Sequence, residues 1–276
     1  MQFIMFTKHV QEFDLPKLVS ALKGAGMDGA DLCVRPGYPV TPENAAKQLP
    51  AAAKAFANAG MSIPLITTPG NFTEPDLPEA EPVFAACAKA GVGLIKLGYW
   101  QYSDGDDYWA MLDSCRRKLD GFAKLAEKHG PKALVHIHSG STMGLNASAA
   151  MRLVEGFDPK CVGVFADPGH LAITGEPPAM AFNILRKYAA CFAFKDTVKL
   201  PVQRDGRDVY VMHTRRIGDG IVDWRQVAKT IVDLKLDTLP ISIHCEYEGE
   251  PAESVVDLAR VDLRYVRKLF AEVGGK

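Results

Sequence analysis

The stretch at 162–170 carries the clearest chemical signal, because a strand pattern there runs into a carboxylate and a histidine. Residues 162–167 alternate with the period of two that is typical of a buried strand, and one face ends in Asp167. Pro168-Gly169 then breaks the strand, and we expect His170 on the following loop. An Asp before Pro-Gly is also ordinary turn chemistry, so the sequence leaves both a structural and a chemical role open for Asp167.

The histidines of this chain are not scattered evenly. Of the seven, His129 lies near the end of an expected helix, whereas the other six lie late in an expected strand or in the loop after one. Parallel α/β barrels keep their active sites at the carboxyl ends of their strands, so this clustering predicts a site there. The six are His9, His136, His138, His170, His213 and His244.

The last expected strand, 241–247, has one polar face, which carries His244 and Glu246. Burying Glu246 without a partner would cost several kcal/mol or keep the carboxyl protonated. The buried carboxylate therefore needs a metal, a cationic side chain or a substrate as its partner. Imidazole and carboxylate ligands suit Mn, Zn, Fe or Mg. If the strand ends meet at one mouth, His136, Asp167 and Glu246 form a candidate metal site.

Several further side chains are candidates for binding or catalysis at the same mouth. Lys195 can act as a general acid or polarise a carbonyl oxygen, and a salt bridge to Asp167 or Glu246 is an equally open and compatible role. Tyr99 could stack on a sugar ring or belong to the core. The expected substrate-binding residues are His138, Arg35, His9, Tyr99 and His244.

These side chains need a scaffold, and the pattern of the chain predicts a single (β/α)8 barrel over residues 1–276. Each expected strand is followed by a helix before the next strand, eight times, which implies parallel strands with right-handed crossovers. A doubly wound open sheet is the alternative, but no GxGxxG follows the first strand. Strands are expected at 2–6, 30–34, 62–67, 93–99, 132–138, 162–167, 191–196 and 241–247, and helices at 15–26, 41–60, 77–91, 108–130, 147–157, 177–189, from 223, and 253–273.

Composition narrows the function classes. The net charge of −1 and the mixing of charge signs argue against a nucleic-acid surface, and no apolar run approaches the ~20 residues of a membrane span. Six scattered cysteines without a CxxC predict free thiols in a reducing compartment. We expect a cytoplasmic location, although a removed leader upstream stays open.

The polar segment 197–222 lacks a clear period, and a lid or a contact in a homo-oligomer is expected there.

Taken together, the motifs at the strand ends resemble the xylose isomerase-like TIM barrel superfamily, and especially its sugar phosphate isomerase/epimerase-like members. The resemblance spans the chain, and the ordered set is more specific than any single motif. The motifs are Asp31-Leu32-Cys33-Val34-Arg35-Pro36-Gly37, His138-Ser139-Gly140, Asp167-Pro168-Gly169-His170, Phe194-Lys195-Asp196, Gly218-Asp219-Gly220-Ile221-Val222-Asp223-Trp224 and Ile243-His244-Cys245-Glu246-Tyr247.

The resemblance implies a divalent metal, Mn, Mg or Zn, held by Glu, Asp, His and Glu at the ends of strands five to eight. Asp167 and Glu246 match the Asp and the last Glu, and His170 matches a histidine near the substrate. The chain departs twice, because His136 stands at the first Glu position and Ala193 at the His position. His136, His138 or His213 could compensate, and we keep the metal as the better expectation.

The leading hypothesis is therefore a metal-assisted isomerase or epimerase, or a related lyase, acting on a small sugar or polyol. It would move a proton next to a carbonyl through an enediolate, with Glu246 as the base and His170 or Lys195 as the acid. A metal-free sugar-binding protein on a degenerate barrel is the alternative, motivated by Ala193. A phosphodiesterase like the apurinic endonucleases is disfavoured by the near-neutral charge and the lack of a multi-histidine, three-metal ligand set.

Overall fold

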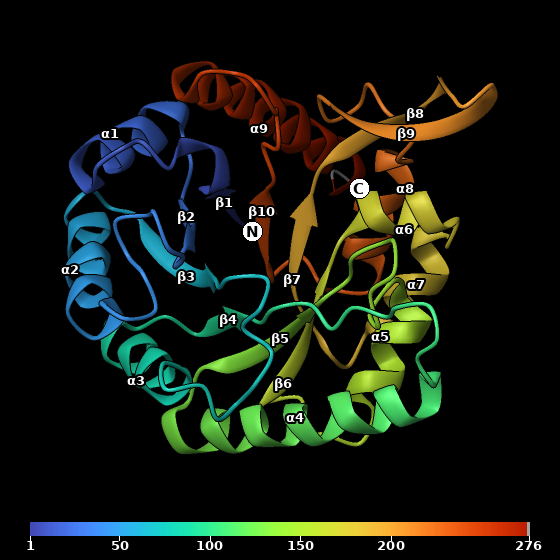
Figure 1. The fold of residues 1–276 in the computed structure, drawn as a ribbon. Helices are drawn as coiled ribbons and strands as arrows, with labels where there is room; N and C mark the ends of the chain where they lie inside the picture. The colour runs from blue at the N-terminus through green and yellow to red at the C-terminus, as the bar shows by residue number, and fades with distance from the viewer. Residues whose placement is uncertain (275–276) are drawn as a thin grey trace.

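The computed structural model describes residues 1–274 and shows a closed, parallel, eight-stranded barrel surrounded by helices (Figure 1). The predicted fold class is confirmed. The order around the barrel is β1-β10-β7-β6-β5-β4-β3-β2, and β1 closes the ring by pairing with both β10 and β2. The barrel strands are β1 (Gln2–Phe6), β2 (Gly29–Cys33), β3 (Ser62–Thr67), β4 (Leu94–Lys96), β5 (Lys132–His136), β6 (Val162–Ala166), β7 (Ala189–Phe194) and β10 (Pro240–Ile243).

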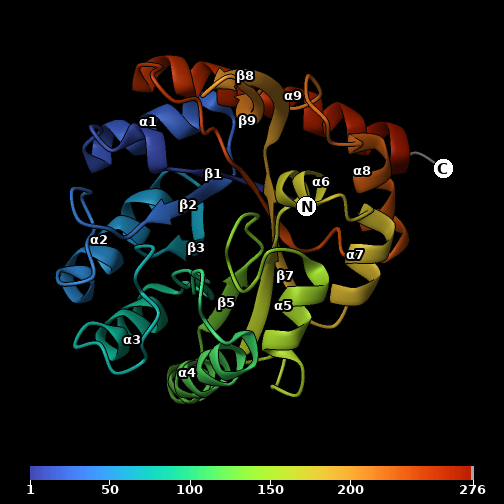
Figure 2. The same cartoon turned by 45° about the vertical axis from the view of Figure 1, so that its right-hand side comes forward.

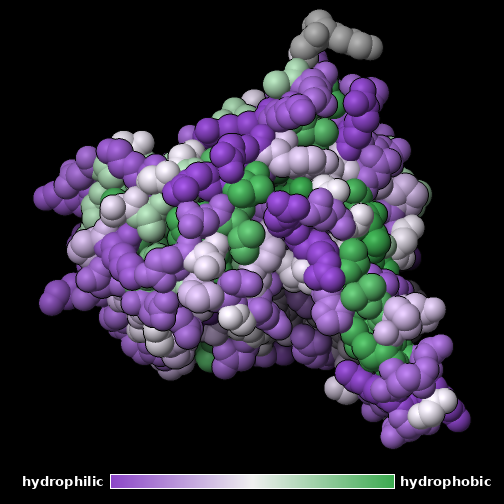
Figure 3. All heavy atoms as spheres, turned by 90° about the horizontal axis from the view of Figure 1, so that it is seen from above, coloured by the Kyte–Doolittle hydropathy of each residue, from purple (hydrophilic) through white to green (hydrophobic). Residues whose placement is uncertain are grey.

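The helices form an outer ring, which Figure 2 shows from a second angle. They bury their apolar faces against the strands, while a second, smaller apolar cluster that includes Ile4, Leu65 and Ala193 fills the barrel interior. On the face seen in the space-filling view, hydrophilic residues predominate, with some hydrophobic residues between them (Figure 3). The helices are α1 (Leu15–Ala25), α2 (Ala45–Asn58), α3 (Ala80–Ala90), α4 (Tyr108–His129), α5 (Ala147–Val154), α6 (Pro168–Thr174), α7 (Pro178–Leu185), α8 (Trp224–Asp233) and α9 (Ala252–Gly274), with a short 3-10 helix η1 (Lys8–Val10) after β1.

Helix starts differ from the sequence prediction in three places, and the first is α3, which begins at Ala80 and not at residue 77. The expected helix from residue 41 begins at Ala45, because Thr41 instead closes a separate turn in which its hydroxyl accepts from the backbone N–H of Asn44. After β6 the chain does not enter a loop. Asp167 is the N-cap and Pro168 the first residue of α6, the position where proline is best tolerated in a helix. His170 therefore lies in the first turn of a short helix.

The segment expected as an irregular lid or contact is a regular antiparallel hairpin, β8 (Asp196–Arg204) and β9 (Arg207–Arg215). It extends away from the ring of helices at the upper right of Figure 1. Asp205 and Gly206 form the two-residue turn, and both have positive φ, at 49° and 72°. Asp-Gly is a favoured sequence for such a turn, because its twist matches the twist of the flanking strands.

The base of the hairpin is held by one buried carboxylate, that of Asp196. It accepts hydrogen bonds from the backbone N–H groups of Thr197, Gly218, Gly220 and Val222 and from the indole N–H of Trp224, at 2.7–3.3 Å. A Cβ at Gly220 would lie 2.0 Å from Asp196 Oδ1, so glycine permits this close approach. The Gly218–Trp224 motif is thus an anchor that returns the chain from the hairpin to α8.

We expect Asp196→Asn to lower the free energy of unfolding by roughly 2–4 kcal/mol, because an amide nitrogen would face N–H donors that now meet a charged acceptor. Urea unfolding followed by circular dichroism would measure the change. Asp233→Asn is the matched control, since Asp233 is exposed and forms an ion pair with Lys229 on the surface of α8. Equal stability of the Asp196 variant and the wild type would contradict the anchoring role.

A second prediction concerns Asp262 of α9, which is 2% exposed and accepts hydrogen bonds from the Tyr247 hydroxyl and the Ile217 backbone N–H. Burial, which outweighs these bonds and the charge of Arg216, raises the pKa of Asp262 to about 6, with a smaller contribution from the Asp196 charge. The folded-state pKa lies above the unfolded one, so this group costs stability as the pH rises from about 4 through 6.

Asp262→Asn removes that ionisation. Relative to the wild type, the variant should gain about 2–3 kcal/mol in free energy of unfolding between pH 4 and pH 7.5. Urea unfolding of both proteins at the two pH values would measure this gain. A constant difference between the two proteins across that range would contradict the assignment.

Candidate functional site

A cavity of about 140 Å³ opens at the carboxyl ends of the barrel strands. It brings together most of the side chains that the sequence singled out, and its lining residues come from all eight barrel strands or the loops that follow them. The position agrees with the rule for parallel barrels. The lining residues are Phe6, Lys8, Arg35, Thr67, Gly70, Tyr99, His136, His138, Phe165, Lys195, His244 and Glu246.

Asp167 has both of the roles that the sequence left open. Its Oδ1 accepts from the His170 backbone N–H at 3.0 Å and so caps α6. Its Oδ2 is fully buried with no hydrogen-bond partner in residues 1–274. That oxygen is surrounded instead by Lys195 Nζ and His136 Nε2, each at 3.4 Å, and His170 Nε2 at 3.7 Å. The carboxylate therefore faces three nitrogen groups at the edge of the cavity.

Lys195 links the two carboxylates of the site. Its Nζ donates to Glu246 Oε2 at 3.0 Å and lies 3.4 Å from Asp167 Oδ2. Burial by itself would lower the pKa of Lys195, but the charges of Asp167 and Glu246 outweigh it and hold that pKa above its ordinary value. The side chain is thus a buried, permanently charged ammonium group. The predicted salt bridge is present to both acids.

Glu246 is paired with a second ammonium group, because Lys8 Nζ donates to its Oε1 at 3.3 Å. Burial would raise the pKa of Glu246, but Lys195, His244 and Lys8 together hold it well below the ordinary value. A carboxylate stabilised in this way is a weak base. The sequence analysis expected Glu246 to act as the base, and a weak base is poorly suited to that role.

His136 and Tyr99 form a buried pair, with the Tyr99 hydroxyl 2.9 Å from His136 Nδ1. Burial, helped by the neighbouring Lys96, His244 and Lys195, holds the pKa of His136 well below its ordinary value, so its ring is neutral. The ring stacks on Phe165 with 4.6 Å between centroids. His136 is fixed in place and points its free Nε2 at Asp167.

His138 differs from the other histidines because its tautomer is set by the backbone. Its Nδ1 lies 2.9 Å from the Ser139 carbonyl oxygen, which can only accept, so Nδ1 carries the proton. The opposite nitrogen, Nε2, then keeps a free lone pair. Burial and the charge of Lys195 lower the pKa of His138, although the bond to Ser139 opposes this. A neutral imidazole with a free nitrogen thus lines the cavity.

His170 lies behind His138, with 4.0 Å between the ring centroids. Its Nδ1 is 2.8 Å from the Ser139 hydroxyl, and burial followed by the charge of Lys195 lowers its pKa well below the ordinary value. His170 borders a second cavity beside the hairpin, which His138 and Lys195 also line. His138 thus packs against both His170 and Tyr99.

Two further expected substrate-binding residues, His244 and Arg35, lie on the cavity wall together with His138 and Tyr99. His244 stacks on Phe6 with 4.4 Å between centroids, and its Nε2 lies 3.6 Å from Asp31 Oδ2. The Nε of Arg35 donates to the Thr68 carbonyl at 3.1 Å. Within the described part of the chain, no carboxylate forms a salt bridge with Arg35, so its remaining N–H groups are available as donors in the cavity.

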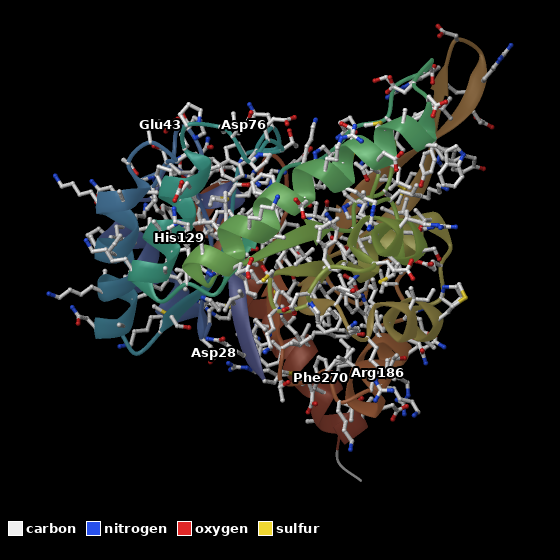
Figure 4. The ribbon with its side chains drawn as sticks, turned by 90° about the horizontal axis from the view of Figure 1, so that it is seen from below. Asp28, Glu43, Asp76, His129, Arg186 and Phe270 are labelled. Carbon is white, nitrogen blue, oxygen red and sulfur yellow. The ribbon has the colours of Figure 1, made fainter. Side chains whose placement is uncertain are left out.

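Besides His170, three histidines are outside the main cavity. His9 lies on η1 and borders a separate cavity with Lys8 and Tyr38, so it does not line the main cavity with the other candidates, and its substrate-binding role stays a prediction. His213 lies exposed on β9 and cannot replace a missing ligand in the main cavity. His129 lies at the C-terminal end of α4 beside Glu81, as the pattern predicted, and is labelled in Figure 4.

Two lysines of the site were missed. Lys8 is the partner of Glu246. It lies just after β1, and this position at the carboxyl end of a strand could have indicated a site residue. Lys96, the last residue of β4, is fully buried, and its Nζ lies 3.5 Å from the centroid of the Tyr99 ring. Burial, followed by the charge of Arg35, holds the pKa of Lys96 well below its ordinary value. A lysine inside an apolar strand pattern could have drawn attention to it.

Comparison with known proteins gives the same assignment as the fold. The sequence model of one protein family matches residues 19–269 of this chain. The chain belongs to the xylose isomerase-like TIM barrel family. An inosose dehydratase from Lacticaseibacillus casei is 26% identical over 158 residues, which are 54% of this chain and 50% of that protein. The chain thus spans about half the length of the curated relatives it matches.

Solved structures of the family are similar along the whole chain. A D-psicose 3-epimerase from Clostridium cellulolyticum H10, determined with D-tagatose, has a TM-score of 0.75 at 15% identity and covers 98% of this chain and 99% of its own. The IOLI protein, determined with a bound zinc atom, has a TM-score of 0.73 at 15% identity, with 99% of each chain covered. At these identities the likeness shows the fold alone.

The metal that this family resemblance implies does not fit the arrangement seen here. Within residues 1–274, no group of three or more His, Cys, Asp or Glu side chains is arranged to hold a metal ion. Ala193 offers no donor, and the ammonium of Lys195 contacts both of the acids expected as ligands. The prediction that Asp167, Glu246 and His136 form a metal cradle is therefore not supported.

Proposed function

We propose that this chain is an enzyme that moves a proton at the carbon next to the carbonyl of a small sugar or polyol derivative. The observation that carries the proposal is the placement of one neutral histidine with a free nitrogen, His138, and one buried ammonium, Lys195, on the wall of the same cavity. A base and a cation are the two groups that enolisation requires.

The proposed chemistry starts with the carbonyl oxygen of the substrate near the Lys195 ammonium. His138 Nε2 accepts the proton from the adjacent carbon, and the electron pair of the C–H bond moves toward the carbonyl oxygen. Lys195 stabilises the negative charge that develops there. Return of the proton to another face or carbon gives epimerisation or isomerisation. In elimination, the enolate electrons form the new C=C bond, and the neighbouring hydroxyl takes the proton from His138 and leaves as water.

The remaining side chains position the substrate and the two reacting groups. Arg35 and His244 provide donors for hydroxyl or carbonyl oxygens, and Tyr99 packs against His138 with 4.7 Å between centroids. His170 also packs against His138 and is a candidate for returning the proton. We assign Glu246 to holding Lys195, in place of the base role expected from the sequence, because its pKa is held well below its ordinary value.

The class of substrate is supported by the relatives. The curated relatives are inosose dehydratases, and the similar structures include a D-psicose 3-epimerase. Both names indicate polyhydroxylated carbonyl compounds, which suit a small cavity lined with hydrogen-bonding groups. The substrate itself and the choice between epimerisation, isomerisation and elimination are what the experiment must decide.

The test is solvent exchange, because every version of the proposal breaks a C–H bond next to a carbonyl. Wild-type protein is incubated in D₂O with a panel of ketoses, aldoses and inososes, and deuterium incorporation is followed by NMR. Exchange at a carbon next to the carbonyl in at least one compound is expected. Thermal stabilisation by a sugar without any exchange would instead favour the alternative of a sugar-binding protein.

Three expectations from the sequence stay predictions. Homo-oligomer formation would be checked by light scattering, and cytoplasmic location by cell fractionation. The structure adds that, within residues 1–274, no helix is long and apolar enough to cross a membrane. The third, the free state of the thiols, agrees with the structure, in which all six cysteines are unpaired, and thiol titration would check it in solution.

A further inference from the structure

We propose that the ammonium group of Lys195 takes the place of a divalent metal ion in this chain, so that its chemistry is independent of metals. This inference rests on the proposed function and names the cation that serves it. It follows from the disagreement between the ligand set that the family resemblance implies and the side chains that this chain places at the same strand ends.

The first observation is that the charge of the two acids is already balanced. Lys195 Nζ lies 3.0 Å from Glu246 Oε2 and 3.4 Å from Asp167 Oδ2, and Lys8 Nζ lies 3.3 Å from the other Glu246 oxygen. The Lys195 side chain is 10% exposed and that of Asp167 is fully buried. An ion bound by both acids would have to displace Lys195 and then lie beside its charge, which like-charge repulsion opposes.

The second observation is that the family's ligand position on β7 carries no donor side chain. Ala193 is fully buried in the apolar layer inside the barrel, together with Ile4, Leu65 and Phe165. His136 uses its Nδ1 in the bond with Tyr99 and has only Nε2 left, 3.4 Å from Asp167 Oδ2. The site therefore lacks the four protein ligands of the family pattern.

The third observation concerns what the ammonium can do. A lysine ammonium has three N–H donors, and here one is donated to Glu246, while Asp167 Oδ2 lies 3.4 Å from Nζ as an ion-pair partner. Lys195 also lines the main cavity and the neighbouring cavity beside the hairpin. An N–H that is not donated to Glu246 is thus available to a substrate oxygen in the cavity. A fixed cation with one free donor can stabilise an enolate oxygen, as a metal would.

The experiment reads metal binding directly. Wild-type protein is dialysed against EDTA, freed of chelator and titrated with Mn²⁺, while free Mn²⁺ is followed by electron paramagnetic resonance. We expect no stoichiometric uptake, and we expect deuterium exchange to proceed at the same rate with and without EDTA. Uptake of one Mn²⁺ per chain that is lost in Asp167→Asn would overturn the inference.

A pair of redesigned variants tests the role of Lys195 itself. The triple variant His136→Glu/Ala193→His/Lys195→Met restores the family ligands and removes the ammonium, whereas the double variant His136→Glu/Ala193→His keeps it. We expect the triple variant to bind Mn²⁺ at least tenfold more tightly than the double variant. Equal affinities would contradict the inference. Circular dichroism checks folding, and the wild-type titration remains decisive if a variant does not fold.

The two proposals can fail separately. Metal uptake is measured without turnover, so Mn²⁺ binding by the wild type, or deuterium exchange that requires added Mn²⁺, would overturn the inference about Lys195 alone. Absence of exchange with every compound of the panel, with or without Mn²⁺, would overturn the proposed function.

Discussion

Replacing Lys195 with methionine should lower kcat/KM for deuterium exchange by about 10²–10³-fold. Methionine keeps much of the length of the side chain but removes the charge that is proposed to stabilise the enolate oxygen. The measurement is the NMR exchange assay with the best substrate of the panel. The effect is expected mainly in kcat, because the negative charge is present in the transition state and not in the bound carbonyl compound.

The same substitution also removes the partner of a buried acid, so loss of activity must be separated from loss of folding. Lys195→Met alone should destabilise the fold by roughly 3–5 kcal/mol, since Asp167 would keep an uncompensated charge. The double variant Lys195→Met/Asp167→Asn should recover much of that stability but not the activity. Lys229→Met, on the exposed surface of α8, is the matched control and should change neither. A stable, fully active double variant would contradict the role of Lys195.

The barrel could be predicted from the sequence because the patterns that indicate its strands and helices are local and recur along the chain. Each strand has a short apolar run, each helix an amphipathic pattern, and glycines end several helices, as Gly26 ends α1 and Gly91 ends α3. The predicted ends of the strands were less accurate than the predicted order of the elements. The last strand was expected to reach residue 247 but stops at Ile243. The polar alternation that continues through His244 and Glu246 belongs to the following loop, which still places both side chains on the cavity wall.

The hairpin and α6 were missed although their signals were present. In β8 and β9, apolar residues recur with a period of two, and Asp205-Gly206 between them is a favoured hairpin turn. Because polar residues alternate with these apolar ones, the segment was interpreted as polar and without a clear period. At α6, Pro168 after Asp167 was interpreted as the end of a strand, although the same pair also marks a helix start. In both segments a local pattern supports two structures, and only the tertiary context selects one.

The site was predicted as a set of residues but not as a set of contacts. Residue types and strand positions were enough to bring Asp167, Lys195 and Glu246 to one mouth. They could not show that the ammonium lies within 3.4 Å of both acids, because that depends on the side-chain conformation of Lys195. For the same reason a metal seemed the better partner of the acids. The tautomer of His138 depends on one backbone carbonyl, that of Ser139, which no residue pattern reveals.

His138 is the residue whose loss should most directly separate the two base assignments. His138→Gln should lower the rate of deuterium exchange by about 10²–10⁴-fold, because the amide group cannot accept the proton from carbon. Glu246→Gln should have a smaller effect, through the position of Lys195. His129→Gln is the matched control, since His129 lies at the C-terminal end of α4 beside Glu81. If Glu246→Gln abolished exchange and His138→Gln retained it, the base would be Glu246.

Chemical rescue distinguishes a base from a residue that only supports the cavity. In His138→Ala the side-chain space would open toward a cavity that already borders Tyr99 and Lys195. Added imidazole should enter this space and restore part of the exchange rate in a concentration-dependent way, whereas it should not rescue Lys195→Met. A His138→Ala variant that folds like the wild type but is not rescued by imidazole or other small amines would point to a positioning role for His138. The same result would leave His170, 4.0 Å away between ring centroids, as the nearest alternative base.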